Sequence, residues 1–241
     1  MSAMLRVENL TRRFGGLLAL DRVAIEVAER AMHGIIGPNG AGKTTLFNII
    51  AGMFAPSEGR VFFADRDITA MAPERLCVLG VARTFQVPRP FAGLSVLDNV
   101  AIGALGSSRN VAAARERARE AIDVLDMGEH VDKLASALTI GLRKRLEVAR
   151  ALATRPKLLL LDEVMGGLHG GEIEHMMAVI RRVNATGVTV VLIEHVMPAI
   201  MSLAGIVTVL DQGRVIASGA PAEVTQDPSV IAAYLGDEVA A

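Results

Sequence analysis

The most conspicuous absences from this 241-residue sequence are aromatic residues, cysteine and an excess of charge. Aromatic residues make up 3% of the chain, with no tryptophan, so the hydrophobic 51% consists mainly of aliphatic residues and methionine. The single cysteine, Cys77, excludes an internal disulfide and is compatible with a reducing compartment. The 25 basic and 26 acidic residues give a formal net charge of −1, which provides no basic surface for nucleic acid. This composition is typical of α/β proteins with buried parallel strands.

Long hydrophobic runs are also missing. The longest apolar stretch covers residues 196–210 and includes Pro198 and Ser202, and it is shorter than the ~20 residues that a spanning helix requires. Near the N-terminus, Arg6 and Glu8 stand where a signal peptide would be apolar. We therefore expect neither an export signal nor a membrane-spanning helix.

Short apolar runs bounded by turn residues recur near the start and the end of the chain. They are rich in valine, isoleucine and leucine on both faces, which is typical of buried strands in a mostly parallel sheet. These runs are HGIIG (33–37), KLLLLD (157–162), VTVVLIE (188–194), IVTVLD (206–211) and RVIAS (214–218).

Helical patterns lie between the apolar runs. Residues 111–127 place alanine, isoleucine and leucine on one face and charged residues on the other, which predicts an amphipathic helix. Further helices are predicted at 143–154 and 172–184. The strand signal is nearly absent from 88 to 138, so we expect a sheet-based core that is interrupted by a mainly helical insertion.

The strongest motif is a phosphate-binding loop, because residues 37–44 match G-x-x-x-x-G-K-[ST] in full. A predicted strand precedes it and a predicted helix follows, so backbone N–H groups and the helix N-terminus should face phosphate oxygens. We expect Lys43 to reach the β- and γ-phosphates and Thr44 to bind Mg²⁺. The candidate nucleotide-binding residues are Gly37, Pro38, Asn39, Gly40, Ala41, Gly42, Lys43, Thr44 and Thr45.

A second motif is the acidic pair that ends LLLLDE. Four apolar residues followed by acids place Asp162 and Glu163 at the C-terminal tip of a strand, the edge where open α/β sheets bind ligands. With the phosphate loop, this spacing predicts that Asp162 holds Mg²⁺ and that Glu163 orients or deprotonates the attacking water. Alone, the pair would be read as solvated acids at a strand end.

Together the two motifs resemble the ATP-binding subunits of ABC transporters, and the resemblance extends over essentially the whole chain. In RTFQ (83–86), Gln86 matches the residue that senses Mg²⁺ and water, and His195 matches the switch histidine that contacts the γ-phosphate. Phe14 falls where the family stacks an aromatic ring on adenine. The alternatives are a core position for Phe14, a surface loop for Gln86 and a purely structural strand-end role for His195.

The resemblance implies an α/β fold with an ABC-type P-loop NTPase core. Its parts are a mixed, mostly parallel central sheet with flanking helices, an N-terminal antiparallel β subdomain and a helical insertion. Residues 1–241 would form one ABC ATPase domain, with the helical subdomain at about 88–150. The implied cofactors are ATP and Mg²⁺. The implied catalytic residues are Lys43, Gln86, Glu163 and His195, and the implied metal ligands are Thr44, Gln86 and Asp162.

Finer features resemble the group that takes up branched-chain amino acids and related urea, amide or aromatic-acid substrates. These features are TTLFNIIAG after the phosphate loop, VARTFQ, and DPSVIAAYLG (227–236). The implied partners are two transmembrane permease subunits, a second ATP-binding subunit and, indirectly, an exported solute-binding protein. We expect a peripheral protein on the cytoplasmic face of the inner membrane, docked through the apolar loop at 86–97.

The stretch that matches the family's LSGGQ signature is altered. It reads LTIGL (138–142), in which Thr139 keeps a hydroxyl and Gly141 keeps a close backbone approach, whereas Leu142 cannot form the hydrogen bonds of glutamine. In this family the signature of one subunit faces the nucleotide of the other, so Thr139 and Gly141 would line the partner's site. We hypothesise a heterodimer with one weaker site, although a homodimer in which Thr-x-Gly suffices stays open.

Three other functions remain possible at this point. A soluble P-loop kinase for a small molecule would need an acceptor site and an arginine-rich lid, and it would leave His195 unexplained. A non-transport ABC ATPase usually carries two cassettes or a long coiled coil, for which this length leaves little room. A weakly hydrolysing nucleotide-binding regulator is compatible with the altered signature.

Overall fold

The structure is a computed structural model that describes residues 3–106 and 110–238, and it divides into two compact units. Unit 1 consists of Met1–Leu76 and Thr189–Ala241, and unit 2 consists of Cys77–Val188. The chain passes from unit 1 to unit 2 within α2 (Pro73–Leu79). No helix in the described part of the chain is long and apolar enough to cross a membrane.

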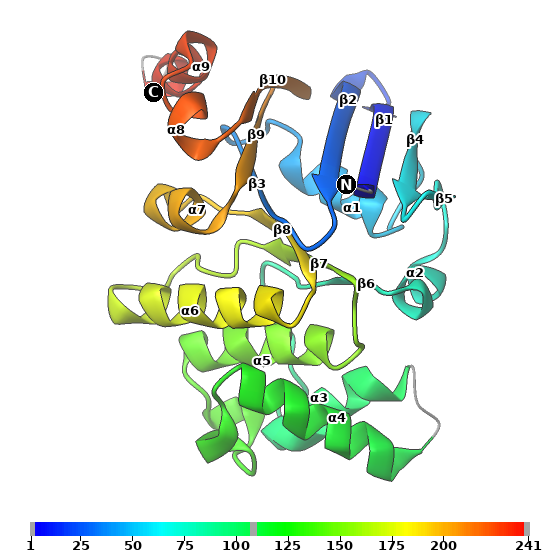
Figure 1. Ribbon diagram of the computed structural model, residues 1–241, viewed down its shortest axis with the longest axis vertical. Coiled ribbons are helices and arrows are strands. Elements are labelled where there is room, and N and C mark those ends of the chain that lie inside the picture. Colours follow the sequence, from blue (N-terminus) through cyan, green and yellow to red (C-terminus); the bar gives the residue numbers. More distant parts are fainter. Residues whose placement is uncertain (1–2, 107–109, 239–241) are drawn as a thin grey trace. The chain divides into compact units, whose positions relative to one another are not determined.

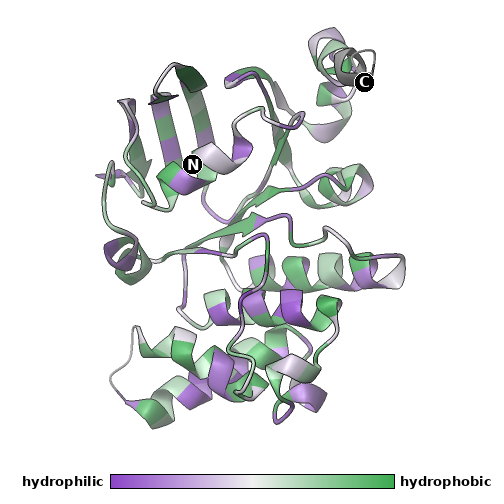
Figure 2. Cartoon of the chain, turned by 180° about the vertical axis from the view of Figure 1, so that it is seen from behind, coloured by the Kyte–Doolittle hydropathy of each residue, from purple (hydrophilic) through white to green (hydrophobic). Residues whose placement is uncertain are grey.

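Unit 1 contains an antiparallel sheet with the strand order β2-β1-β4-β5. Along β1, Leu5 and Val7 are buried while Arg6 and Glu8 are more exposed, because successive side chains point to opposite faces of the sheet. Figure 2 shows the matching alternation of hydrophobic and hydrophilic bands along these strands. This sheet is the predicted N-terminal antiparallel subdomain. Its strands are β1 (Ala3–Phe14), β2 (Leu17–Ala28), β4 (Glu58–Phe63) and β5 (Arg66–Asp67).

Unit 1 also contains a mixed sheet built around β3 (Met32–Ile36). This strand pairs in parallel with β8 (Thr189–Ile193) and with β9 (Ile206–Asp211), and β9 pairs in antiparallel with β10 (Arg214–Gly219). All of β8 is buried, as the apolar run predicts for a strand covered on both faces. The helices of this unit are α1 (Lys43–Ile50), α7 (Met197–Leu203), α8 (Pro221–Val224) and α9 (Pro228–Glu238).

Unit 2 combines a pair of parallel strands with a group of packed helices. The strand β6 (Val81–Arg83) pairs with β7 (Leu158–Asp162), so both end at the same edge. Figure 1 shows α5 running alongside α6, with α3 and α4 packed on the other side of α5. The helices are α3 (Val96–Leu105), α4 (Val111–Val124), α5 (Ile140–Leu152) and α6 (Gly171–Ala185).

The strand and helix types agree with the sequence predictions, but the run at 214–218, which was predicted to be a buried strand, forms β10, an antiparallel edge strand with no buried residue. The other differences are at helix ends. The helix predicted at 111–127 ends at Val124, and the helix predicted at 143–154 begins earlier, at Ile140. The second difference arises because Thr139 caps the helix: its hydroxyl accepts a hydrogen bond from the Leu142 N–H. The predicted helical insertion at about 88–150 falls inside unit 2, and its boundary within a single ABC domain stays a prediction.

Candidate functional site

The phosphate loop of unit 1 connects the end of β3 to the start of α1. Gly37 has φ 148° and Gly42 has φ 101°, which are conformations that other residues rarely adopt. A Cβ on Gly37 would overlap the Leu210 carbonyl oxygen, and one on Gly42 would lie 2.6 Å from the Ala19 oxygen. Glycine is therefore required at both positions, by backbone conformation and by space.

Lys43 is the charged residue of this loop, and it is buried. Its Nζ donates to the carbonyl oxygens of Gly37 at 2.6 Å and of Pro38 at 2.8 Å, which folds the side chain back over the loop. The N-cap residue of α1 is Gly42, which has no side chain to cap the helix, so the first N–H groups of this helix suit an anion. Thr44 is exposed at the same end.

His195 lies at the same sheet edge as the phosphate loop. In the parallel pairing of β3 with β8, Ile35 aligns with Ile193, so Gly37 and His195 both follow the carboxyl ends of neighbouring strands. His195 is exposed, and Glu194 before it is buried. Unit 1 therefore brings the predicted phosphate loop and the predicted switch histidine to one edge.

Phe14 is at the surface, so the alternative of a core position does not hold. Its ring is 42% exposed and meets Phe54 edge-on, with 5.5 Å between centroids and 84° between planes. The Arg12 guanidinium lies 4.5 Å from the Phe14 centroid. An exposed ring held by an aromatic and a cationic neighbour provides a face on which a base can stack.

Tyr234, on α9, is a contact of the phosphate loop that the motif analysis missed. Burial raises the pKa of Tyr234, and a backbone hydrogen bond from Gly37 opposes this rise in pKa. In the sequence, this tyrosine was only part of the DPSVIAAYLG stretch (227–236). Its proximity to Gly37 became visible only in the folded chain.

In unit 2, the carboxylate of Asp162 is the most buried charged group at the end of β7, with 2% exposure. The Arg83 guanidinium donates to Asp162 Oδ2 at 2.7 Å. The Asp162 N–H donates to the Thr84 hydroxyl at 3.2 Å. The other oxygen, Oδ1, is buried and has no hydrogen-bond partner among the described residues. A buried acceptor of this kind is costly unless a ligand or water meets it.

Glu163 follows directly and is held at both its side chain and its backbone. The Gln86 amide donates to Glu163 Oε2 at 2.5 Å. Its backbone has φ 49°, which is a left-handed conformation that costs about 1–3 kcal/mol in a residue other than glycine. The Glu163 carbonyl oxygen accepts hydrogen bonds from Lys144 Nζ at 2.8 Å and from the Gly166 N–H at 3.2 Å. Unit 2 therefore brings together Gln86, Asp162 and Glu163, three of the candidate site residues.

The donor groups fit Mg²⁺ better than a transition metal. In the parts of the chain that the structure describes, no three His, Cys, Asp or Glu residues gather as a metal cluster. Mg²⁺ instead takes few protein oxygens together with water and phosphate oxygens. In unit 2, the Oδ1 of Asp162, which has no hydrogen-bond partner among the described residues, is an oxygen of this kind. In unit 1, the exposed Thr44 provides a hydroxyl oxygen.

The altered signature forms the start of α5. Thr139 is exposed, whereas Gly141 is buried, and a Cβ on Gly141 would lie 2.7 Å from Glu172 Oε1. Glu172 therefore places a carboxylate beside the first turn of α5. A pocket of about 190 Å³ is lined by Thr139, Gly141, Leu142 and Glu172, among others.

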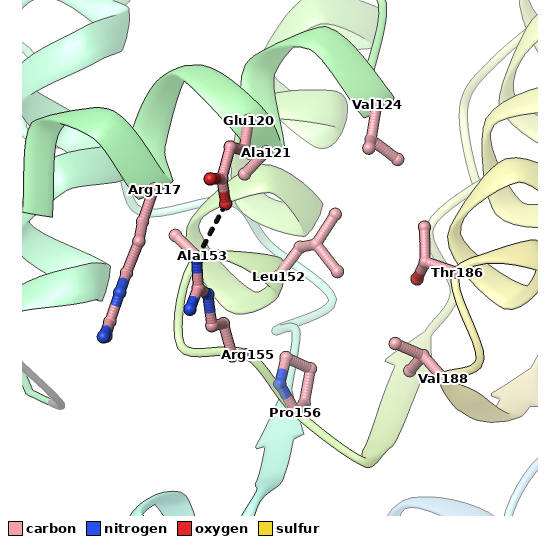
Figure 3. Close-up of a pocket in the computed structure, with 10 residues that line it drawn as sticks. All are labelled: Arg117, Glu120, Ala121, Val124, Leu152, Ala153, Arg155, Pro156, Thr186 and Val188. Carbon is pink, nitrogen blue, oxygen red and sulfur yellow. Dashed lines mark hydrogen bonds and ion pairs between the residues drawn. The ribbon is translucent and has the colours of Figure 1, made fainter. Parts of the chain in front are cut away.

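A second pocket of unit 2, of about 270 Å³, is lined by none of the predicted site residues (Figure 3). Leu152 and Val124 form its apolar side, and Glu120 and Arg155 meet across it in an ion pair of 3.0 Å. Both charged side chains are 58% exposed, so this pair contributes little to stability.

Besides Tyr234, two contacts of the acidic site were missed because each needs the fold. Arg83 was read only as part of RTFQ, yet the parallel register aligns it with Leu160 and lets it reach Asp162. Lys144 was only one position of the helix predicted at 143–154, yet it is buried against Glu163. Neither residue carries a sequence signal, since each pairing joins segments that are far apart in the chain.

Comparison with known proteins identifies the family. The family model described as "ABC transporter" matches residues 20–166, and the model described as "Branched-chain amino acid ATP-binding cassette transporter" matches residues 214–240. The high-affinity branched-chain amino acid transport ATP-binding protein LivG of Salmonella typhimurium is 36% identical over 97% of this chain and 98% of its own. BraF of Pseudomonas aeruginosa, which has the same description, is also 36% identical over 97% and 98%.

Solved structures agree with the sequence relatives. The ADP conformation of MJ1267, an ATP-binding cassette of an ABC transporter, superposes with a TM-score of 0.90 at 33% identity and covers 98% of this chain and 100% of its own. The predicted fold class and family resemblance are thereby confirmed. The chain belongs to the ABC transporter family, as one of its ATP-binding, ATP-hydrolysing cassettes.

Proposed function

We propose that this chain powers the import of a branched-chain amino acid, or a related small solute, through a membrane ABC transporter. The support is the 36% identity to LivG and BraF, whose names specify branched-chain amino acid transport, and the C-terminal match at 214–240. Membership of the ABC transporter family also favours this function over a small-molecule kinase, which was open from the motifs alone.

ATP binds through the phosphate loop in this proposal. The loop N–H groups and Lys43 Nζ hold the β- and γ-phosphates. To do so, Lys43 Nζ gives up its hydrogen bonds to the carbonyl oxygens of Gly37 and Pro38. Phe14 stacks on the adenine, and His195 contacts the γ-phosphate. For the partner subunit's nucleotide, Thr139 and Gly141 provide the opposing surface.

The observation that carries the catalytic assignment is the arrangement of the two acids that end β7. Glu163 is fixed by Gln86 at 2.5 Å, and the adjoining Asp162 is buried with one bare oxygen. Glu163 takes a proton from a water whose oxygen bonds to the γ-phosphorus as the β–γ bridging bond breaks, giving ADP and phosphate. Mg²⁺, held by Thr44, Gln86 and Asp162, would neutralise charge on the phosphate oxygens.

The proposed docking surface for a permease is the apolar loop of unit 2 at 86–97. Val87, Phe91 and Leu94 are exposed there, with 65%, 47% and 37% of each residue accessible. The loop is nevertheless ordered by the buried Asn99, which accepts from the Phe91 N–H and donates to the Phe91 oxygen. An ordered apolar surface is typical of an interaction site.

The proposed assembly contains two transmembrane permeases, a second ATP-binding subunit and an exported solute-binding protein. This chain would then lie peripherally on the cytoplasmic face of the inner membrane. Glu172, close to Gly141, places negative charge beside the surface that would meet the partner's phosphates. Because like charges repel, this carboxylate would slow turnover at the partner's site, and in a heterodimer only that one site would be affected.

The decisive experiment uses the complex purified from membranes through a tag on this chain and reconstituted in lipid vesicles. Glu163→Gln should lower kcat for ATP by about 10²–10⁴-fold, because general base catalysis is lost, while ATP binding is kept. Uptake of radiolabelled leucine, isoleucine or valine should fall in parallel. Unchanged kcat would contradict the proposal, and ATP-dependent uptake of none of the three would contradict a branched-chain amino acid as the solute.

The asymmetry is tested by changing the equivalent glutamate of each ATP-binding subunit separately. Unequal losses of ATPase activity from the two changes support the heterodimer with one weak site. Equal losses, or copurification of this chain with a second copy of itself, would contradict a heterodimer with one weak site.

A further inference from the structure

A buried lysine on α5 contacts the backbone of the proposed catalytic glutamate. Lys144 is 7% exposed, although lysine is almost never buried this deeply without a specific partner. Its Nζ donates to the Glu163 carbonyl oxygen at 2.8 Å. A hydrogen bond from a charged donor is roughly twice as strong as one between neutral groups.

This contact acts where the backbone of Glu163 is strained. The φ of 49° turns the chain sharply after Asp162, and the Gly166 N–H closes the turn by donating to the same Glu163 oxygen at 3.2 Å. A Cβ on Gly166 would lie 3.7 Å from Lys144 Nζ, so the ammonium group sits against the whole turn. Strained conformations persist only where their surroundings hold them.

The same helix begins with the altered signature. Gly141 and Lys144 are three positions apart on α5, so they lie on one face of the helix. The first turn of α5 is thus connected to the turn at Glu163 through one rigid helix and one hydrogen bond. Gln86, which follows β6 in the chain, donates a hydrogen bond to the Glu163 carboxylate.

We propose that Lys144 is a positioning residue that sets the backbone of Glu163 and couples it to the signature end of α5 in the same chain. The inference rests on the proposed function, in which Glu163 activates water and the start of α5 meets the partner's nucleotide. When that nucleotide engages Thr139 and Gly141, α5 carries Lys144 with it. Each subunit's glutamate is then aligned by occupancy of the other site.

The side chain of Lys144 matters through both its length and its charge. Methionine fills similar space but cannot donate, so Lys144→Met should remove the coupling with little loss of packing volume. Arginine keeps the charge and the donors, so Lys144→Arg should restore part of the function. The matched control is Glu120→Gln, which breaks an exposed ion pair elsewhere in the helical part of unit 2.

The test uses the complex purified from membranes, with ATP turnover measured at saturating Mg²⁺. Lys144→Met is expected to lower kcat by about 10–100-fold, because misplacing a catalytic group by about 1 Å costs that much, and to change KM for ATP less than about twofold. Lys144→Arg is expected to recover about a third or more of kcat. Glu120→Gln should keep kcat within about twofold of the unmodified complex.

Hydrogen exchange at the amides of residues 164–166 provides a second readout if Lys144→Met assembles poorly. In Lys144→Arg, ATP bound at the partner's site should still slow exchange there, and in Lys144→Met this protection should be lost. The coupling is overturned if both variants have the same kcat as the unmodified complex. It is also overturned if KM and kcat fall together and arginine does not restore them. If Glu163→Gln keeps full kcat in the same preparation, the proposed function itself fails, and the coupling fails with it.

Discussion

The phosphate loop of unit 1 and the acidic site of unit 2 are built in opposite ways. The loop is one contiguous segment, residues 37–45, and its shape comes from glycine backbone and main-chain contacts. The acidic site is assembled from the end of β6, α5 and the end of β7, and charged side chains hold it: Arg83 on Asp162 and Lys144 on Glu163.

The difference indicates which substitutions should destabilise each site. A loop held by its backbone tolerates loss of a side chain structurally, so its side chains are free to serve the ligand. A site held by buried charges loses stability when one partner is removed, because the remaining charge is left uncompensated.

The largest expected effect is on the buried pair of unit 2. Arg83→Met should lower the free energy of unfolding by about 3–5 kcal/mol, because it leaves the Asp162 carboxylate buried without its cation. Urea denaturation of the full chain measures this loss. The control is Arg115→Met, which breaks the exposed pair with Asp98 and should cost less than about 1 kcal/mol. Similar losses in the two variants would show that the buried ion pair does not stabilise the acidic site more than an exposed ion pair would.

A somewhat smaller effect is expected at the phosphate loop, and it should fall on activity rather than stability. Lys43→Ala removes the cation that meets the phosphates and should lower kcat/KM for ATP by about 10²–10³-fold, or about 2.7–4 kcal/mol. Its free energy of unfolding should fall by less than in Arg83→Met, because glycine fixes the loop and the Lys43 side chain adds only its hydrogen bonds to the oxygens of Gly37 and Pro38. Lys133→Ala, on an exposed lysine, serves as the control for both measurements. A large loss of stability in Lys43→Ala would show that the side chain supports the loop.

The smallest expected effect is a loss of stability at acid pH, caused by His33 in β3, the strand that leads into the phosphate loop. Burial lowers the pKa of His33 from 6.5 to about 4, and its Nε2 lies 2.8 Å from the Thr208 hydroxyl. The unfolded chain therefore binds this proton first as the pH falls. Stability should decline from about pH 6.5 to about pH 4 and then level off, by at most about 3 kcal/mol.

Unfolding by urea across this pH range measures the slope. His33→Gln should abolish the His33 contribution, and His175→Gln, on a less buried histidine, should keep it. If both variants keep the full slope, the acid sensitivity of the chain arises elsewhere than at β3.

Much of the fold could be predicted from apolar periodicity. The runs that became β3, β7, β8 and β9 were found because strands covered on both faces leave continuous Val, Ile and Leu. Helix ends were less accurate, as at Thr139, where a single capping hydroxyl decides the first residue. A threonine at this position is a common capping residue, but helical periodicity alone does not identify caps.

The candidate site could be predicted only where the motif is local or ends a strand. Gly37 to Thr45 form one segment, and Asp162 with Glu163 follow one apolar run, so adjacency in sequence was enough. Arg83 and Lys144 gave no such signal, because each contacts its carboxylate or carbonyl partner across a large separation in the chain. Tyr234 near Gly37 was missed for the same reason.

The sequence by itself determined the glycine-bounded phosphate loop, the strand-end acids and the aliphatic runs that form the sheets, since each depends on neighbouring residues and on the chain's own periodicity. Only the tertiary structure decided which charges became buried partners and how Glu163 was held in a left-handed turn. The register of β6 against β7 and the packing of α5 bring those groups together. Such contacts depend on the path of the whole chain, and no local pattern encodes them.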